Sequence, residues 1–369
     1  MKILVTGSKG FIGKNLIVEL RNRGYKEILE VSRDTKPDLL YKYCKEADFV
    51  FHLAGVNRPK DQSEFMEGNF NFTYKLINIL KENKNTCPIM YASSIQAEFN
   101  NPYGKSKKAT EDLLFDYSKE TGAKVLIYRF PNVFGKWCRP NYNSAVATFC
   151  YNIARCLPIT ITDPSIKINL AYIDDVVNEL INALEGRENK VGLFCEVPII
   201  YSATLGEIVK LIYSFKKSRE DKTIPNMSNE FVKKLYSTYL SYLPKDEFNY
   251  ELKMNVDQRG SFTEFIRTID RGQISINISK PGITKGNHWH HSKNEKFLVV
   301  SGKAVIRLRR IDSDEIIEYY VSGDKLEVIE IPVGYTHNIE NIGDSDLVTI
   351  IWANEPFDPE KPDTYYLEV

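Results

Sequence analysis

The chain has 369 residues, of which 43% are hydrophobic and 27% are charged, a composition that excludes an intrinsically disordered protein and suits two folded domains. Lys plus Arg and Asp plus Glu each number 49, so the chain lacks the basic excess of a dedicated nucleic-acid binder. No window approaches about eighteen consecutive apolar residues, and no cleavable apolar segment precedes the first strand, so we expect a cytoplasmic protein without a membrane span.

The first part of the chain alternates short β-rich runs with helical stretches. Residues 2–5 are predicted to form a strand, and residues 14–23 a helix with one apolar face. Further strands are expected at 28–31, 49–53, 89–92 and 125–128, and helices at 73–82 and 104–120. Such alternation predicts an α/β domain with a Rossmann-type parallel sheet and helices on both faces.

Glycines follow the first predicted strand in the spacing GxxGxxG, at Gly7, Gly10 and Gly13. Gly7 permits a tight turn, Gly10 lets the backbone approach a pyrophosphate, and Gly13 lets the helix pack closely on the sheet. The helix N-terminus would then face the phosphates. A plain strand–helix turn is the alternative, but the place at the start of an alternating α/β pattern favours dinucleotide binding.

The end of the second predicted strand bears on the choice of cofactor. An acidic residue there binds the ribose hydroxyls of NAD, whereas a basic residue accommodates the phosphate of NADP. Here Ser32 stands in the place of the acid, Arg33 follows it and Lys36 is close by. These residues favour NADPH, although Asp34 complicates the choice and Arg33 could be a solvated surface charge.

Tyr103 and Lys107 have YxxxK spacing at the start of a predicted helix, nine residues after the pair Ser93–Ser94. Two other YxxxK spacings occur in the chain, so this one gains weight only from its position. Positions i and i+4 share a helix face, so we expect the Lys107 ammonium to lie near the Tyr103 phenol and lower its pKa. Ser94 could hydrogen-bond the same carbonyl oxygen as Tyr103, and we prefer it to Ser93.

Six short motifs in chain order resemble the extended short-chain dehydrogenase/reductases, a class that acts on nucleotide sugars, over about residues 1–243. They are GSKGFIG (7–13), HLAG (52–55), the serine pair (93–94), PYGKSK (102–107), RFPNVFG (129–135) and IDDV (173–176). One departure is the run IQAE at 95–98, which replaces a VYG-like run and makes the choice between the two serines less secure.

The resemblance implies roles for individual residues. Ser94, Tyr103 and Lys107 would be catalytic, with Tyr103 donating a proton to the carbonyl oxygen and Lys107 also holding the nicotinamide ribose. Asn132 and Ser94 would lie beside the substrate. The cofactor would further contact Phe11, Ile12, Leu53 and Ala54, besides the three glycines.

From about residue 250 the pattern changes to short strands without intervening helices. Runs at 297–300 and 304–308 flank a glycine turn and predict a hairpin, and further strands are expected at 316–321, 326–331 and 347–352. This predicts an all-β barrel or sandwich. The polar, proline-broken stretch near 242–247 marks the boundary, so we expect domains at 1–243 and 252–369 with a linker at 244–251.

The spacing from Gly282 through His288, His290 and Glu295 to Gly302, and the run PVGYTH at 332–337, resemble the two motifs of cupin barrels. His288 and His290 are two apart on a strand and project to one face, where Glu295 and His337 would join them from neighbouring strands. Three imidazoles and one carboxylate suit a divalent transition metal, and zinc is favoured because nothing indicates redox chemistry in the barrel. A chance cluster of histidines, or a metal-free dimerisation module, is the alternative.

Residues 257–264 and 276–290 resemble the cupins that epimerise 4-keto deoxy-sugar nucleotides. Those enzymes generally lack a metal, so the ligand set here is a departure that favours metal-assisted enolisation. The pairing of both halves resembles the capsular-polysaccharide enzymes of the CapF/WbjC type. That resemblance implies a UDP-sugar substrate, C3 epimerisation in the cupin, NADPH-dependent reduction of the C4 ketone, and a role in UDP-N-acetyl-L-fucosamine synthesis. We also expect a homodimer, because cupins commonly pair through edge strands.

Three other interpretations remain open. The front domain could be an epimerase or dehydratase that retains its NAD, with Glu98 as the nearest acid for a dehydratase. The cupin could be a module that only senses sugar or dimerises. The whole chain could be a binding or regulatory protein with a degenerate reductase fold, which the intact Ser94, Tyr103 and Lys107 argue against.

Overall fold

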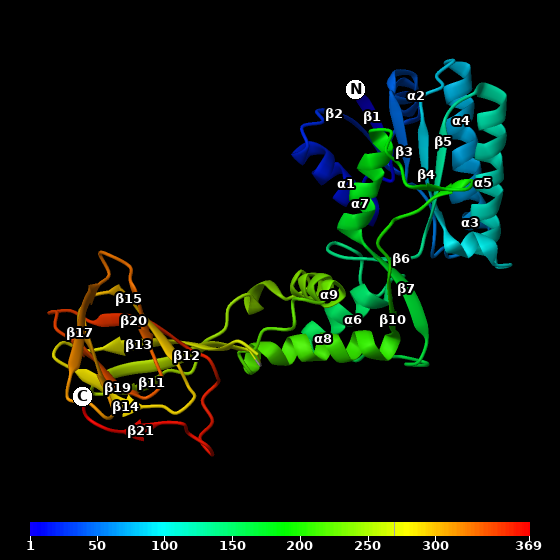
Figure 1. The fold of residues 1–369 in the computed structure, drawn as a ribbon. Coiled ribbons are helices and arrows are strands. Elements are labelled where there is room, and N and C mark those ends of the chain that lie inside the picture. The colour runs from blue at the N-terminus through cyan, green and yellow to red at the C-terminus, as the bar shows by residue number, and fades with distance from the viewer. Residues whose placement is uncertain (269) are drawn as a thin grey trace. The chain divides into compact units, whose positions relative to one another are not determined.

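The computed structural model describes residues 1–268 and 270–369 and divides the chain into two compact units (Figure 1). The first unit comprises residues 1–213 and 229–244, and the second comprises residues 214–228 and 245–369. None of the described helices is long and apolar enough to cross a membrane.

The first unit is built on a seven-stranded sheet in the order β2-β1-β3-β4-β5-β9-β8. Strands β2 to β9 in that order are parallel, and only the short edge strand β8 is antiparallel to its neighbour. The strands are β1 (Lys2–Thr6), β2 (Glu27–Val31), β3 (Phe49–His52), β4 (Ile89–Ser94), β5 (Val125–Phe130), β8 (Lys190–Val191) and β9 (Phe194–Cys195). The predicted Rossmann-type parallel sheet is confirmed.

Helices cover both faces of this sheet because successive strand residues point to opposite faces. Ile3 and Val5 of β1 pack in one buried cluster with α1 and α7, whereas Leu4 packs in a second cluster with α2, α4 and α5. Figure 1 shows these two groups of helices on opposite faces of the sheet. The helices are α1 (Phe11–Asn22), α2 (Pro37–Glu46), α4 (Phe72–Glu82), α5 (Pro102–Thr121) and α7 (Ile173–Leu184). The strand order reverses between β1 and β3, and such a switch point opens a ligand crevice at the carboxyl ends of the strands.

Smaller elements lie beyond the carboxyl ends of the main sheet. A three-stranded sheet joins β6 (Asn132–Phe134), β7 (Lys167–Tyr172) and β10 (Tyr201–Thr204). The remaining helical elements of the first unit are α3 (Ser63–Phe65), the π-helix η1 (Met66–Asn71), the 3-10 helix η2 (Ile95–Glu98), α6 (Ala145–Ala154), α9 (Glu230–Leu240) and the first part of α8 (Leu205–Glu220). The rest of α8 and the 3-10 helix η3 (Lys245–Glu247) belong to the second unit.

The second unit consists of two antiparallel sheets, in the orders β11-β12-β13-β20-β15-β18 and β17-β16-β19-β14-β21. Its buried core includes Phe297, Val299, Ile306, Leu308 and Ile339, which come from both sheets. The strands are β11 (Asn255–Asp257), β12 (Gly260–Thr268), β13 (Gly272–Ser279), β14 (Thr284–Trp289), β15 (Glu295–Ser301), β16 (Lys303–Arg310), β17 (Ile316–Ser322), β18 (Val328–Ile331), β19 (Tyr335–Asn341), β20 (Leu347–Ala353) and β21 (Tyr365–Tyr366). The all-β prediction is confirmed, and the architecture is that of a cupin-like barrel.

Residues 214–228 cluster with the second unit through contacts to β12. Lys222 forms an ion pair with Glu264 at 3.1 Å, and Glu264 also pairs with Arg267. Thr223 makes a parallel bridge with Arg267, whose backbone N–H donates to the Lys222 carbonyl at 2.9 Å. Part of the chain that precedes the expected linker thus contributes to the β-rich unit.

Candidate functional site

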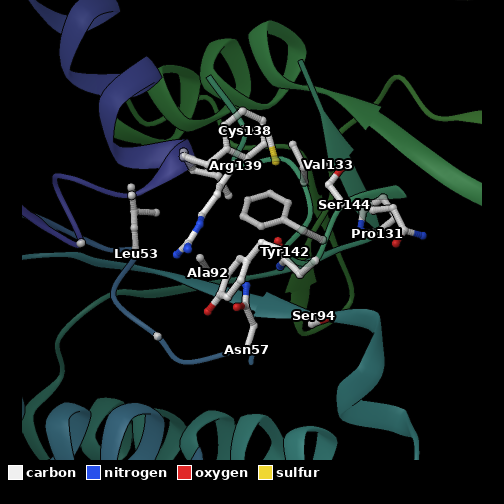
Figure 2. A pocket seen from close by; sticks show the side chains of 18 of the residues that line it. Leu53, Asn57, Ala92, Ser94, Pro131, Val133, Cys138, Arg139, Tyr142 and Ser144 are labelled. Carbon is white, nitrogen blue, oxygen red and sulfur yellow. The ribbon is translucent and has the colours of Figure 1, made fainter. Parts of the chain in front are cut away.

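A cavity of about 850 Å³ lies at the crevice of the first unit (Figure 2). Its wall is formed by the glycine turn after β1, the ends of β3 and β4, the start of α5, and the segment around and after β6. Ten of the residues that the sequence pointed to line it: Gly7, Gly10, Phe11, Ile12, Gly13, Leu53, Ser94, Tyr103, Lys107 and Asn132.

The glycine turn after β1 is packed so closely that residues larger than glycine would not fit at Gly7 and Gly13. Gly7 has a φ of +71°, and a Cβ there would lie 2.8 Å from the Ala54 nitrogen. A Cβ at Gly13 would lie 2.3 Å from the Gly7 carbonyl oxygen, so α1 could not approach the turn with a larger residue. No side chain caps the N-terminus of α1, which leaves its backbone N–H groups free to bind an anion. Ala54 itself lies behind Gly7 and is not part of the cavity wall.

The residues that favour NADPH lie beside this cavity and outside its lining. Arg33 and Lys36 are exposed, and the Ser32 backbone N–H donates to Thr35 Oγ1 at 2.9 Å. Asp34 forms an exposed ion pair at 2.7 Å with Lys9, which does line the cavity. Asp34, the acidic residue that complicates the choice between NADPH and NAD, is therefore paired with Lys9.

Ser94, Tyr103 and Lys107 come together on one side of the cavity. Ser94 is the last residue of β4. Its Oγ accepts a hydrogen bond from the Gln96 N–H at 3.2 Å and lies near Tyr103, which is close to the start of α5. That helix begins at Pro102 and is capped by Asn101, whose Oδ1 accepts from the Gly104 N–H at 2.8 Å. Lys107 lies one turn further along, with its Nζ 5.9 Å from the centre of the Tyr103 ring.

The expectation that Lys107 lowers the pKa of Tyr103 is wrong in this structure. Burial raises the pKa of Tyr103 above its usual value of 10, and the nearby Ser94 hydroxyl only partly opposes this. The Lys107 ammonium donates to the Ala92 carbonyl at 2.8 Å, and burial lowers its own pKa to about 8. Tyr103 thus keeps its proton at neutral pH and is suited to act as an acid.

The two adjacent serines have different partners because successive strand residues point to opposite faces. Ser93 is buried and donates to Glu111 Oε1 at 2.6 Å. Ser94 is less buried and lies near Tyr103. Asn132 is exposed at the cavity and donates from Nδ2 to the Asn169 carbonyl at 3.2 Å.

The loop after β6 forms one wall of the cavity, although none of the motifs in the sequence predicted its role. Figure 2 shows Arg139 and Tyr142 extending from this loop, and the Arg139 guanidinium lies 4.9 Å from the centre of the Tyr142 ring. The buried Tyr242 hydroxyl donates to the Cys138 carbonyl at 2.6 Å and anchors the loop. The concentration of aromatic and basic residues at 137–142, directly after the RFPNVFG motif, was the available signal.

In the second unit the four predicted metal ligands form one cluster. The nearest ligand atoms of His288, His290, Glu295 and His337 all lie within 4.8 Å of one another. Glu295 Oε2 lies 3.5 Å from His290 Nε2 and 3.2 Å from His337 Nε2. His291 is exposed outside this cluster, and its ring makes edge-to-face contacts with Trp289 and Tyr365.

The protonation and hydrogen bonding of this cluster fit a metal. Burial lowers the pKa of His288 to about 4, so its imidazole is neutral. Burial by itself would raise the pKa of Glu295, but the imidazoles of His290 and His337 hold it below its usual value. His290 Nε2, Glu295 Oε2 and both ring nitrogens of His337 are buried without a hydrogen-bond partner. Buried polar atoms of this kind are costly unless they are bound, and these are the donors that a transition metal takes.

Asp363, near the C-terminus, forms hydrogen bonds with the ligand His290 and with the backbone of the residues that follow it. The Asp363 carbonyl accepts a hydrogen bond from His290 Nδ1, so the proton lies on Nδ1 and Nε2 is left as the ligand atom. The Asp363 carboxylate accepts from the backbone N–H groups of His291, Ser292 and Lys293 at 2.9, 2.7 and 2.9 Å. Sequence spacing contained no signal for this residue.

Comparisons with known proteins agree with this architecture. The sequence model of the NAD dependent epimerase/dehydratase family matches residues 3–193, and that of the polysaccharide biosynthesis C-terminal domain matches residues 255–365. UDP-2-acetamido-2,6-beta-L-arabino-hexul-4-ose reductase of Pseudomonas aeruginosa is 46% identical over 370 residues, which cover 100% of this chain and 99% of that protein.

Solved structures show the same relationship. The capsular polysaccharide assembling protein CapF of Staphylococcus aureus is 57% identical, with a TM-score of 0.95 over 100% of both chains. UDP-glucuronic acid 4-epimerase of Bacillus cereus, solved in complex with NAD, is 22% identical with a TM-score of 0.52. This match covers 58% of this chain and 83% of the epimerase, and it indicates a shared fold only.

Proposed function

The chain belongs to the NAD-dependent epimerase/dehydratase family and is a full-length homologue of CapF, and from this premise we propose that it is a bifunctional nucleotide-sugar enzyme of surface-polysaccharide synthesis. Its first unit reduces the C4 ketone of a UDP-linked 4-keto-6-deoxy-HexNAc, and its cupin unit epimerises C3 of the same sugar. The product is UDP-N-acetyl-L-fucosamine. Since nucleotide sugars and NADPH are made in the cytoplasm, the reaction belongs there.

The observation that carries the reductase assignment is that Ser94, Tyr103 and Lys107 line the same cavity as the glycine turn. NADPH, when bound, supplies the hydride that adds to C4. Tyr103 donates its proton to the O4 oxygen, Ser94 hydrogen-bonds that oxygen, and Lys107 holds the nicotinamide ribose. Asn132 contacts the sugar. The raised pKa of Tyr103 supports this role, because reduction of a ketone consumes a proton.

The cofactor is NADPH, held by Gly7, Gly10, Phe11, Ile12, Gly13 and Leu53 with Ala54 behind the turn. Ser32 leaves room for a 2′-phosphate, and Arg33 and Lys36 are exposed cations that can reach it. Asp34 does not oppose this choice, because its charge is compensated by Lys9.

In the cupin unit, His288, His290, Glu295 and His337 hold a divalent metal, for which zinc has the preferred donor set. The metal supplies a Lewis acid for the C4 carbonyl, which makes the proton on C3 more acidic. Epimerisation precedes reduction, because reduction removes the ketone on which the acidity of C3 depends.

A dehydratase that retains its NAD is the less favoured function. Glu98 was the nearest acid for such a reaction, but its Oε1 accepts a hydrogen bond from Arg129 at 2.8 Å. Glu98 also does not line the cavity, so it is poorly placed to donate a proton to a sugar bound there.

We further propose a homodimer formed through the cupin unit. Strand β11 lies at the edge of the six-stranded sheet, and Val256 on it is 69% exposed. Phe262 and Phe265 on the adjacent strand are also exposed, so the edge offers an apolar surface as well as unpaired backbone groups. Light scattering should give twice the chain mass, and Val256→Lys should reduce it to one chain mass.

The direct experiment is to follow NADPH oxidation with a UDP-4-keto-6-deoxy-HexNAc and to determine the product by NMR, in the wild type and in Tyr103→Phe. We expect oxidation in the wild type, its loss in the variant, inversion at C3, and a lower rate with NADH. Absence of oxidation with both NADPH and NADH would overturn the reductase assignment.

A further inference from the structure

A fully buried carboxylate lies beside the Ser94–Tyr103–Lys107 group. Glu111 is on α5, one turn beyond Lys107, and is 0% exposed. It accepts from Ser93 Oγ at 2.6 Å, from Arg129 Nε at 2.9 Å and from Arg129 Nη2 at 2.6 Å. A buried charge is costly unless it is paired and hydrogen-bonded, so all of these contacts are needed to keep Glu111 in place.

These contacts connect the elements that carry the proposed catalytic residues. Ser93 and Arg129 are direct partners in the pairing of β4 with β5, and Ser94 immediately follows Ser93. Arg129 also packs over the Phe194 ring at 3.8 Å and pairs with Glu98, which restrains its guanidinium. Glu111 therefore ties the helix with Tyr103 and Lys107 to the strand end with Ser94.

Glu111 is also the carboxylate whose negative charge favours the protonated form of Lys107. The titratable groups facing Lys107 are Tyr103 on the same helix, Tyr91 on β4 with its ring 4.8 Å away, and His52 on β3. All three are neutral at pH 7, because burial raises the pKa of both tyrosines and lowers that of His52 to about 3. Burial opposes the charge on Lys107, and Glu111 favours it.

We propose that Glu111, held by Arg129, is a positioning residue of the reductase reaction that holds the end of β4, with Ser94, beside α5, with Tyr103, and favours the cationic form of Lys107. The inference rests on the proposed reductase function. It assigns a role to a residue that contacts neither sugar nor cofactor.

The charge effect is tested by Glu111→Gln, which keeps the shape of the side chain and removes its charge. The pH profile of kcat/KM for NADPH-dependent reduction should lose activity at a lower pH than the wild type, by about one pH unit. Glu98→Gln is the matched control, because it removes the other carboxylate partner of Arg129 at a largely exposed position. Its profile should coincide with that of the wild type.

The geometric effect is tested by Ser93→Ala, which removes one hydrogen bond and no charge. We expect kcat to fall about tenfold while the alkaline limb of the profile stays where it is in the wild type. If Glu111→Gln fails to fold, the double variant Glu111→Gln/Arg129→Met removes both charges of the pair together and should still show the shifted limb.

An alkaline limb in Glu111→Gln that coincides with the wild type would overturn the inference. If the wild type itself oxidises no NADPH, the reductase proposal fails, and the inference is then judged by binding alone. NADPH affinity measured by fluorescence should weaken at a lower pH in Glu111→Gln than in the wild type, and equal pH dependence would overturn it.

Discussion

Tyr103 and Lys107 lie in a poorly hydrated part of the first unit, and desolvation affects them in opposite senses. It makes Tyr103 a weaker acid than free tyrosine and makes Lys107 lose its proton more readily than free lysine. The proposed reduction needs both residues in their protonated forms. Because burial lowers the pKa of Lys107 to about 8, Lys107 is the first of the two residues to lose its proton as the pH rises.

The rate of reduction should thus be limited at alkaline pH by Lys107. Below about pH 8 Lys107 is cationic and Tyr103 is protonated, so kcat/KM should be nearly constant from neutrality to that point; above it kcat/KM should fall about tenfold per pH unit. Steady-state NADPH oxidation between pH 6 and 10 measures this. Lys107→Arg keeps its charge throughout the range, so an equally steep loss in that variant would assign the limb to another group.

At the metal cluster, His290 distinguishes an active cupin from one that only senses sugar. We expect His290→Ala to lose most of its bound metal and to reduce the ketone without inverting C3, because the reductase residues belong to the other unit. Metal analysis and NMR of the product measure both effects. His291→Ala is the control, since that ring is exposed, and it should retain metal and epimerisation. Inverted product from metal-free His290→Ala would contradict the metal-assisted mechanism.

Among the elements, β21 and the residues before it connect the end of the described chain to the metal-bearing strand. Tyr366 pairs with His288 across β21 and β14, and the Leu367 N–H donates to the Asn287 carbonyl at 3.0 Å. Asp363 adds its contacts to His290 and to the turn that follows it. Hydrogen bonds of this kind orient a histidine toward its metal.

Removal of this support should weaken metal binding while all four ligands remain. We expect Asp363→Ala, and more strongly the deletion of residues 363–369, to reduce metal affinity by about 10- to 100-fold. Competition with a chromogenic chelator measures the affinity without any turnover. Asp358→Ala changes an exposed carboxylate in the same segment and should leave it unchanged. Equal affinities in all variants would show that the ligands are oriented without the segment.

For the whole molecule, the contribution of residues 214–228 to the β-rich unit affects how that unit folds. Lys222, Glu264 and Arg267 form a half-buried charged network between this segment and β12. A chain covering residues 214–369 should therefore have a larger free energy of unfolding than one covering residues 245–369, by on the order of 1–3 kcal/mol. It should accordingly unfold at a higher temperature. Thermal unfolding with and without Lys222→Ala measures the difference, and equal midpoints would place the boundary at 245.

Patterns that are local in sequence were the predictable part of this protein. The parallel sheet, the glycine turn, the hairpin of β15 and β16 and the four clustered ligands follow from periodicity of 2 or 3.6 residues and from short fixed spacings. The resemblance to the extended short-chain dehydrogenase/reductases predicted that Ser94, Tyr103 and Lys107 act together, and all three line the same cavity at the crevice of the parallel sheet.

Sequence alone thus determined that this chain joins a dinucleotide-binding fold to a β-barrel with a metal-type ligand set, since each rests on residues close together in the chain. Only the tertiary structure decided the hydrogen-bond partners of three buried groups. Lys107 donates to the Ala92 carbonyl, Glu111 accepts from Ser93 and Arg129, and His290 donates to the Asp363 carbonyl. The tertiary structure also decided the protonation of Tyr103. The reason is physical: burial and long-range partners set charge and orientation, and both depend on segments that meet only when the chain folds.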